Sequence, residues 1–286
     1  MSVGDILAPM AVVAALGLIV YAFLVEPYWI RLSEVDIRIE GLPESLDGFK
    51  ICHLSDTHTS RYGRLERKLS KLLSGIEADL CVITGDLLNA KAGREALRRV
   101  LSLFNPRFGF FAVLGNGDYK PQILLPECVG ELEQLGIQLL QNSSATLLPN
   151  GLEMSIIGVE DPFLGLDDIA RAMSGAAEGG FKLLLAHSPD VVVEAAGQPL
   201  DLILAGHTHG GQVRIPAIGA FWLHCRYRLG ISGGCYGPEV LSRALKRDVG
   251  RLQMYVNRGV ASGTLSPRFM CPPEVALITL HRRFRA

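Results

Sequence analysis

At Phe49-Lys50-Ile51-Cys52-His53-Leu54-Ser55-Asp56-Thr57-His58, a short apolar run passes directly into an acid and an imidazole. The apolar part, residues 49–54, has the length of a buried strand, and residues 65–76 then show the spacing of an amphipathic helix. The same alternation recurs in predicted strands at 80–83 and 110–114 and in predicted helices at 94–104 and 128–135. Strands that alternate with helices predict βαβ units and a largely parallel, buried sheet.

Further apolar runs extend this pattern toward the C-terminus. They predict strands at residues 154–159, 183–185, 202–204, 254–256 and 275–280. Residues 35–39 alternate apolar and charged side chains, which is typical of an edge strand. Two sheets packed face to face, with helices outside, would accommodate this many strands in one α/β domain. The glycine-rich segment 206–237 is expected to form long loops at the functional site, because it follows a strand and has few helix formers.

The N-terminus carries a long run without charge. Residues 6–25 contain no charged side chain, and at about 1.5 Å per residue such a helix would span roughly 30 Å, the hydrocarbon thickness of a bilayer. Glu26-Pro27-Tyr28-Trp29 follows and supplies interfacial aromatic side chains, whereas a secretory signal would need a cleavage site there. A membrane anchor is therefore predicted, and a cleaved signal or a buried core helix are its alternatives.

This pattern divides the chain into three parts: an anchor over 1–30, a linker and edge strand over 31–45, and a folded domain over 46–286. Lys and Arg are absent before the apolar run, whereas Arg31 and Arg38 follow it. The positive-inside rule then places the folded domain of a single-pass cell-membrane protein on the cytoplasmic side.

The overall composition excludes several classes of function. The 28 Lys and Arg against 29 Asp and Glu give a net charge of -1, so no overall field steers the chain to nucleic acid, and no such partner is expected. Hydrophobic residues at 49% exclude a disordered chain. The 6 cysteines have neither the spacing of a zinc motif nor that of a disulfide framework.

Polar residues stand where five of the predicted strands end. The five polar ends are Ser55-Asp56-Thr57-His58, Gly85-Asp86, Gly115-Asn116-Gly117-Asp118, Ala186-His187-Ser188-Pro189 and Gly206-His207-Thr208-His209-Gly210-Gly211. Ligands of open α/β sheets bind beyond the carboxyl ends of the strands, so these side chains are expected to converge on one place.

The converging side chains suit a divalent metal centre. They are two carboxylates, an amide and four imidazoles: Asp56, Asp86, Asn116, His58, His187, His207 and His209. Such mixed N/O donors prefer borderline ions such as Mn, Fe, Co, Ni or Zn. Seven ligands are too many for one tetrahedral ion, but a bridging carboxylate, for which Asp86 is the candidate, would give each of two ions four protein ligands. The alternative for any single residue is a structural hydrogen bond, and for Asn116 a turn after glycine.

The same motifs resemble a known family in their order and approximate spacing. Over about residues 46–281, the chain is similar to the calcineurin-like metallophosphoesterases in Asp56-x-His58, Gly85-Asp86, Gly115-Asn116, His187 and Gly206-His207-x-His209. Within the family, the chain most resembles a bacterial membrane-anchored or exported branch of predicted phosphodiesterases. The motifs that carry this likeness are Gly-His-Thr-His-Gly-Gly-Gln at 206–212, Asn257-Arg258-Gly259 and Cys271-Pro272-Pro273-Glu274.

The resemblance implies a four-layer α/β/β/α sandwich and a metal-dependent phosphoric ester hydrolase. It implies two divalent ions such as Mn, Fe or Zn, with a metal-bridging hydroxide as nucleophile. Carried over by position, one ion would be held by Asp56, His58, Asp86 and His209, and the other by Asp86, Asn116, His187 and His207. Asp86 and Asn116 are the predicted catalytic residues.

The chain departs from the family pattern at Gly117. The family has Gly-Asn-His followed by an acid, whereas this chain has Gly115-Asn116-Gly117-Asp118. The family His is assigned as general acid or as phosphate positioner, and glycine can do neither. General-acid help contributes roughly 10²–10⁴-fold and matters most for a basic leaving group. Gly117 therefore disfavours monoesters and favours an activated phosphodiester or a pyrophosphate.

The sequence leaves several functions open. An active enzyme would cleave a soluble nucleotide or a lipid-linked substrate, and the anchor favours the lipid-linked one. In this respect the chain resembles the UDP-2,3-diacylglucosamine pyrophosphate hydrolases of lipid A synthesis, whose motif has Arg at the position of Gly117. A metal-binding scaffold or sensor without catalysis is a hypothesis of another class. A purely structural membrane protein is a third, which predicts no stoichiometric metal.

The loop beyond His209 offers candidate substrate contacts. Arg226 and Arg228 could bind a phosphate or a lipid head group, because Arg forms bidentate pairs with such anions. His224 in the same loop is a candidate replacement for the missing acid. The alternative for all three is an ordinary solvated loop side chain.

Overall fold

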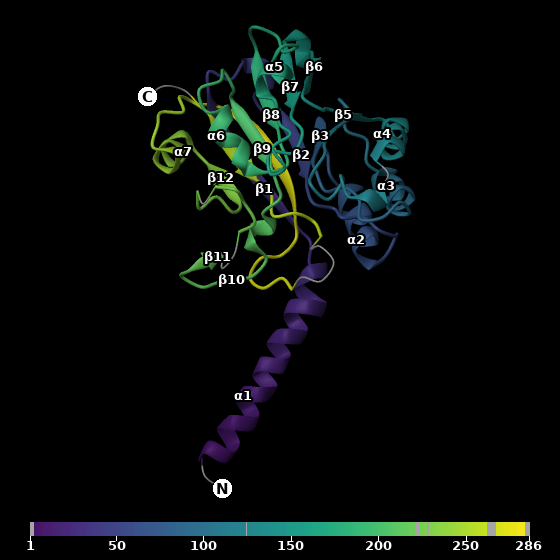
Figure 1. Ribbon diagram of the computed structural model, residues 1–286, viewed down its shortest axis with the longest axis vertical. Coiled ribbons are helices and arrows are strands. Elements are labelled where there is room, and N and C mark those ends of the chain that lie inside the picture. Colours follow the sequence, from purple (N-terminus) through teal and green to yellow (C-terminus); the bar gives the residue numbers. More distant parts are fainter. Residues whose placement is uncertain (1–2, 124, 221–222, 228, 262–266, 284–286) are drawn as a thin grey trace.

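The structure, a computed structural model, describes residues 3–123, 125–220, 223–227, 229–261 and 267–283, and two six-stranded sheets form the centre of this part of the chain (Figure 1). The first sheet has the order β1-β14-β2-β3-β4-β5. Its strands are β1 (Arg31–Glu40), β14 (Glu274–Arg283), β2 (Lys50–Leu54), β3 (Leu80–Thr84), β4 (Phe110–Val113) and β5 (Ile137–Leu139). Strands β2 to β5 are parallel, β14 is antiparallel to β2, and β1 pairs parallel with β14 along its whole length.

The second sheet has the order β12-β13-β9-β8-β7-β6. Its strands are β12 (Gly234–Tyr236), β13 (Gln253–Val256), β9 (Leu202–Ala205), β8 (Phe181–Leu185), β7 (Met154–Gly158) and β6 (Ser143–Leu147). The four inner strands are parallel, and both edge strands are antiparallel to their neighbours. A separate hairpin consists of β10 (Arg214–Ile215) and β11 (Gly219–Ala220).

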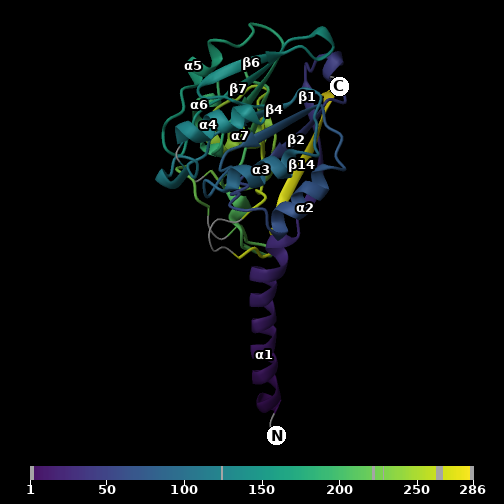
Figure 2. The same cartoon turned by 90° about the vertical axis from the view of Figure 1, so that its right-hand side faces the viewer.

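Helices cover the outer face of each sheet (Figures 1 and 2). The first sheet carries α2 (Arg64–Leu73), α3 (Gly93–Leu101) and α4 (Leu125–Gln134), and the second carries α5 (Ile169–Met173), α6 (Val192–Ala195) and α7 (Pro238–Leu245). Side chains alternate along each strand. In β8, Leu183 and Leu185 pack between the sheets, whereas Leu184 packs under the outer helices. The predicted four-layer α/β/β/α sandwich is confirmed.

The sequence pattern misses several short elements. Strand β6 is mostly polar, Ser143-Ser144-Ala145-Thr146-Leu147, because it is an edge strand with one partner. Helices α5 and α6 have 5 and 4 residues, which is too short for a helical period to show in the sequence. The segment 206–237, predicted as long loops, also contains the β10–β11 hairpin and β12.

The carboxyl ends of the parallel strands face the N-terminal helix. Helix α1 (Val3–Val20) continues through a π-helical turn (Tyr21–Val25) and a 3-10 turn (Glu26–Tyr28) into β1. Because β14 runs parallel to β1 and antiparallel to β2, strand β2 and its parallel neighbours run back toward this helix. Figures 1 and 2 show α1 projecting from this end of the sheets. Within the described residues, one helix is long and apolar enough to cross a membrane, in the span Ile6–Tyr28.

Candidate metal centre

All seven candidate ligands lie directly beyond the carboxyl ends of strands. The first sheet supplies four of them, with Asp56 and His58 after β2, Asp86 after β3 and Asn116 after β4. The second sheet supplies three, with His187 after β8, and His207 and His209 after β9. The structure therefore brings together residues that are up to 153 positions apart, from Asp56 to His209, at one end of the sandwich.

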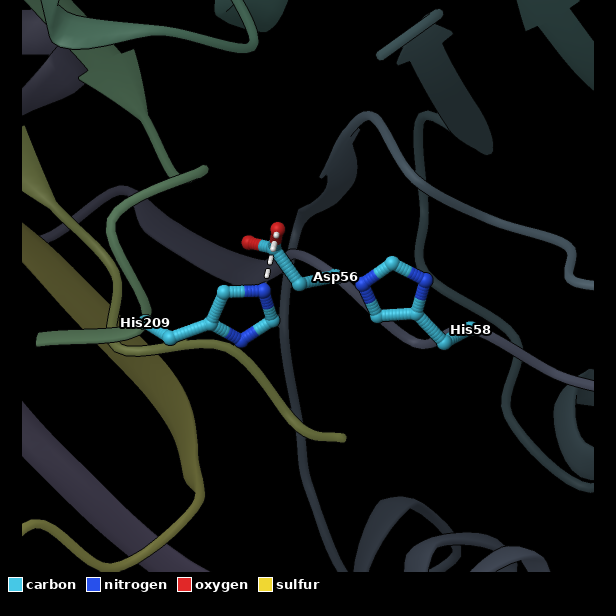
Figure 3. A group of neighbouring side chains, drawn as sticks. All are labelled: Asp56, His58 and His209. Carbon is cyan, nitrogen blue, oxygen red and sulfur yellow. Dashed lines mark ion pairs between the residues drawn. The ribbon is translucent and has the colours of Figure 1, made fainter. Parts of the chain in front are cut away.

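The buried carboxylate of Asp56 points toward the ring of His209, and the ring of His58 lies nearby (Figure 3). Asp56 Oδ1 is 3.5 Å from His209 Nε2, and the ring of His58 is stacked on that of His209 with centroids 5.4 Å apart. The other oxygen, Oδ2, accepts hydrogen bonds from the Ser55 hydroxyl at 2.6 Å and from the His207 backbone N–H at 3.0 Å. Asp56 therefore presents a single oxygen to this group of side chains. One ligand atom each from Asp56, His58 and His209 lies within 4.8 Å of the others.

Asp86 lies between imidazoles of the two predicted ion sites. Its Oδ2 is 3.4 Å from His58 Nε2, and its Oδ1 is 3.5 Å from His187 Nε2. The backbone N–H of Gly117 donates to Oδ1 at 2.6 Å, which orients the carboxylate. A carboxylate with one oxygen toward each imidazole has the geometry that a bridging ligand needs.

Several polar atoms of the centre are buried without a hydrogen-bond partner among the described residues. They are Asp56 Oδ1, His58 Nε2, Asn116 Oδ1 and His207 Nε2. A buried polar atom without a partner costs about 1–3 kcal/mol, so several in one place call for a missing partner. Two of these atoms belong to residues of the Asp56, His58 and His209 group, and carboxylate oxygen with imidazole nitrogen is a donor set that fits divalent cations, so the residues pass the test for a metal centre.

Hydrogen bonds on the far side of the rings set which nitrogen faces the centre. Nδ1 of His58 lies 2.9 Å from Asn89 Oδ1, Nδ1 of His187 lies 2.8 Å from the Thr84 carbonyl, and Nδ1 of His209 lies 3.0 Å from the Ala261 carbonyl. Because each of these oxygens accepts a proton from Nδ1, the opposite Nε2 is the nitrogen that could bind a metal ion. His207 differs, since its Nδ1 lies 3.0 Å from Nε2 of His187.

Replacing Asn89 by Ala is expected to lower metal affinity by about 10–100-fold, because outer partners of ligating histidines have effects of this size. The His58 ring would lose its Nδ1 acceptor while the metal-facing side stays chemically intact. Titration of the metal-free protein with Mn²⁺ measures this affinity. Asn105→Ala, at an exposed asparagine outside the centre, is the matched control. Equal affinities for both variants would show that Asn89 does not position His58.

The backbone of the centre is strained at five candidate ligands. Their φ angles are positive, in the left-handed region that side chains rarely adopt: Asp56 (50°), His58 (44°), Asp86 (51°), His207 (67°) and His209 (49°). Each such residue costs about 1–2 kcal/mol, and strain of this kind clusters at functional sites. The fold therefore holds these side chains in place at the expense of stability.

The two carboxylates stay ionised although they are buried. Burial opposes the charge of Asp56, but the imidazoles of His209 and His187 hold its pKa below its ordinary value. Burial likewise opposes the charge of Asp86, and His187 again lowers the pKa. The centre therefore carries negative charge that attracts a cation.

The histidines divide into two groups. Burial would lower the pKa of His187, but the charges of Asp86 and Asp56 raise it to about 9. For His207 and His209, burial dominates and lowers the pKa to about 3 and about 4. The last two rings are therefore neutral at physiological pH, which is the state that binds metal ions.

Two of the three candidate substrate residues, His224 and Arg226, lie within the described part of the chain. The exposed His224 ring lies 4.5 Å from the Phe163 ring and 5.4 Å from the His207 ring, so the structure brings it beside the centre. Arg226 is exposed and donates to the Pro162 carbonyl at 3.0 Å, next to Phe163. Arg228 lies outside the described residues.

Sequence reasoning misses residues that support the centre from outside. Asp118 accepts hydrogen bonds from the backbone N–H groups of Leu87, Leu88 and Gly115, and so ties the loops after β3 and β4 together. The fully buried Arg268 donates to the Ala261 carbonyl at 2.7 Å, the same carbonyl that His209 contacts. The buried position of such an arginine is a long-range property of the fold, and no local pattern in the sequence signals it.

Comparison with known proteins agrees with this geometry. The calcineurin-like phosphoesterase family matches residues 49–211. The chain is 31% identical to the metallophosphoesterase YkuE of Bacillus subtilis over 269 residues, which cover 91% of this chain and 88% of that protein. It is 29% identical to the phosphodiesterase YaeI of Escherichia coli, covering 91% of this chain and 92% of that protein.

The UDP-2,3-diacylglucosamine pyrophosphatase LpxG of Chlamydia trachomatis is 26% identical, over 91% of this chain and 92% of that protein. Both the family match and the relatives span the strands whose ends carry the candidate ligands. The chain belongs to the calcineurin-like metallophosphoesterases, which are metal-dependent hydrolases of phosphate esters.

Proposed function

We propose that the protein is a phosphodiesterase or pyrophosphate hydrolase with two divalent ions, such as Mn, Fe or Zn. The position of Asp86 carries this proposal, because its two oxygens face imidazoles of the two ligand sets, 3.4 Å from His58 and 3.5 Å from His187. Asp56, His58 and His209 would complete one set, and Asn116, His187 and His207 the other.

The residues of the centre would then bind and orient the scissile phosphate. When bound, the ions would supply positive charge for the phosphoryl oxygens and a water acidic enough to ionise near neutral pH. Asn116 offers an amide oxygen without a hydrogen-bond partner in the described residues, in the loop whose next N–H orients Asp86. The outer hydrogen bonds of His58, His187 and His209 would keep the site preorganised, so that little rearrangement accompanies the reaction.

The chemistry at Gly117 favours substrates with a good leaving group. Gly117 contributes a backbone N–H to Asp86 and has no side chain to protonate a leaving oxygen. A nucleotide or phosphate leaving group departs without a proton, whereas an alkoxide needs one. This favours diesters and pyrophosphates over alkyl monoesters.

The orientation of the centre favours a lipid-linked substrate. The strand ends that carry the ligands face the end of the domain from which α1 projects, so a bilayer crossed by α1 would lie next to the centre (Figure 1). The name of the Chlamydia relative describes an enzyme for a diacylated sugar nucleotide. A soluble nucleotide is the alternative substrate, and it would gain nothing from this placement.

Basic residues near the membrane-side end support a cytoplasmic location. Arg31 follows the helix in the sequence, and folding brings Arg64 and Lys68 to Tyr28 beside it. Clusters of Lys and Arg next to a membrane span are typical of the cytoplasmic side.

Hydrolysis of bis(p-nitrophenyl) phosphate and of an alkyl monoester, glycerol 1-phosphate, by the Mn²⁺-loaded full-length chain in detergent tests the proposed reaction. We expect the diester to turn over about 10²-fold faster or more, because the alkoxide leaving group of the monoester lacks general-acid help here. Chelation should abolish both activities. Equal or faster monoester turnover would show that another residue, with His224 the nearest candidate, supplies the proton. Stoichiometric metal without turnover of either compound would favour a scaffold or sensor.

A further inference from the structure

The β10–β11 hairpin has an apolar tip that projects into solvent. The tip is Ile215-Pro216-Ala217-Ile218, and all four residues are exposed, with Ile218 at 72% and Ile215 at 39%. Surface turns are normally built from Gly, Pro, Asn, Asp and Ser, so a tip with two exposed isoleucines is unusual in water. Met270, which is 53% exposed, lines one hollow of about 450 Å³ together with this tip.

The hairpin is tied to the end of the apolar helix. The Arg214 N–H donates to the Phe269 carbonyl, and the Phe269 N–H donates to the Gln212 carbonyl, so the loop before β14 pairs with the base of the hairpin. The Phe269 ring packs edge-on against Tyr21, with centroids 6.3 Å apart. The N–H of the neighbouring Arg268 donates a hydrogen bond to the Ala22 carbonyl at 2.9 Å. The hairpin base therefore lies beside the last turns of the helix.

The residues expected to mark the bilayer surface follow the contact between Tyr21 and Phe269 in the sequence and lie nearer the domain. Trp29 and Tyr28 follow the helix, with Arg31 over the Trp29 ring and Arg64 over the Tyr28 ring. Aromatic rings with adjacent cations are typical of the head-group region. Tyr21, which the Phe269 loop contacts, precedes Tyr28 by two helical turns and so lies deeper than these rings.

We propose that Ile215, Ile218 and Met270 form a bilayer-docking surface that inserts into the acyl-chain region next to the helix. This inference rests on the proposed membrane anchor and deepens the proposed lipid-linked substrate. Its occupant is the lipid of the leaflet that faces the domain. Figure 1 shows β10 and β11 at the end of the domain from which α1 projects, to one side of the helix.

Docking at this hairpin would place lipid directly beside the candidate metal centre. The hairpin begins three residues after Gly211, in the loop that carries His207 and His209. The side chain of Arg214 at its base donates to the Gly210 carbonyl at 2.9 Å, so the position of the hairpin is coupled to the ligand loop. A lipid-linked phosphate could then reach the centre while its acyl chains stay in the membrane.

Lipid quenching of a fluorescent label tests the surface without any need for catalysis. The label NBD is attached at Ile218→Cys, or at Leu148→Cys as control, in a full-length chain with Cys128, Cys225 and Cys235 replaced by Ser. Leu148 is 61% exposed, between β6 and β7 at the opposite ends of the strands. In nanodiscs of phosphatidylcholine and phosphatidylglycerol, doxyl-labelled lipid should quench the label at 218 and leave the label at 148 unchanged. Equal emission with and without doxyl lipid at 218 would overturn the proposal, whether water or a second copy covers the tip.

A second measurement separates this surface from the proposed reaction. Ile218→Asp should hydrolyse soluble bis(p-nitrophenyl) phosphate at the wild-type rate. On hexadecyl p-nitrophenyl phosphate in vesicles of the same lipids it should be slower by roughly tenfold, as expected when one isoleucine can no longer be buried. Equal loss on both substrates, or no loss on either, contradicts a docking role. Inactivity of the wild type on both substrates would contradict the proposed function and leave the quenching result to decide the surface.

Discussion

Replacing Asp86 by Ala is expected to abolish hydrolysis of bis(p-nitrophenyl) phosphate and to leave less than the wild-type amount of bound metal. Asp86 is buried, and its two oxygens face His58 and His187, so the variant would lose a ligand from both proposed ion sites at once. Charge stabilisation by bound ions contributes several kcal/mol, which corresponds to a loss of about 10³-fold or more in kcat/KM.

The control for this variant is Asp248→Ala. Asp248 is exposed, accepts a hydrogen bond from the Gly250 N–H, and lies between α7 and β13, outside the centre. It should retain wild-type kcat/KM and metal content by elemental analysis. An Asp86→Ala protein that keeps more than a tenth of the activity would exclude a bridging role for this carboxylate.

Introducing a side chain at position 117 is expected to disrupt the centre. A Cβ at Gly117 would lie 2.7 Å from Asp86 Oδ1 and 2.9 Å from Asp86 Cγ, so the carboxylate would have to move. Displacement of a catalytic group by about 1 Å can cost about 10²-fold in rate. Gly117→Ala should therefore reduce diester hydrolysis by this amount or more, and Gly117→His should lower activity even though it restores the family residue.

Gly130→Ala is the matched control for these variants. Gly130 lies in α4, and a Cβ built there meets nothing within 4 Å. This variant should keep full activity and raise the free energy of unfolding by about 0.5–1 kcal/mol, because alanine is the better helix former. Monoester hydrolysis gained by Gly117→His would contradict the packing argument, since it would mean that the loop accommodates an acid beside Asp86.

Local sequence patterns predict most of the strands and helices, whereas the four-layer sandwich is implied by the family resemblance. Buried parallel strands are short continuous apolar runs, as at residues 80–83 and 202–204, and the amphipathic helices between them have a clear period. Polar residues at the ends of these runs are expected to gather at one edge within each sheet, because parallel strands end at the same edge. The packing of the two sheets then brings the two edges together. The predicted convergence of Asp56, Asp86 and the four histidines rests on this topological rule.

Other features depend on contacts between distant segments and leave no local signal. β1 pairs with β14, which lies at the other end of the chain. The length of β1, residues 31–40, is set by this pairing and has no local signal in the sequence. The role of Asn89 depends on the approach of the loop after β3 to His58. The left-handed backbone at Asp56 or His209 is imposed by the surrounding loops, because even Asp and His, which adopt it more often than most non-glycine residues, do so uncommonly.

The electron paramagnetic resonance spectrum of the Mn²⁺-loaded full-length protein tests the two-ion centre most directly. If Asp86 bridges, the spectrum at full loading should show exchange coupling between two Mn²⁺ ions, at a stoichiometry of two per chain. The coupling should disappear in Asp86→Ala and persist in Asp248→Ala. A fully loaded wild-type protein with only the spectrum of isolated Mn²⁺ would contradict the bridged centre.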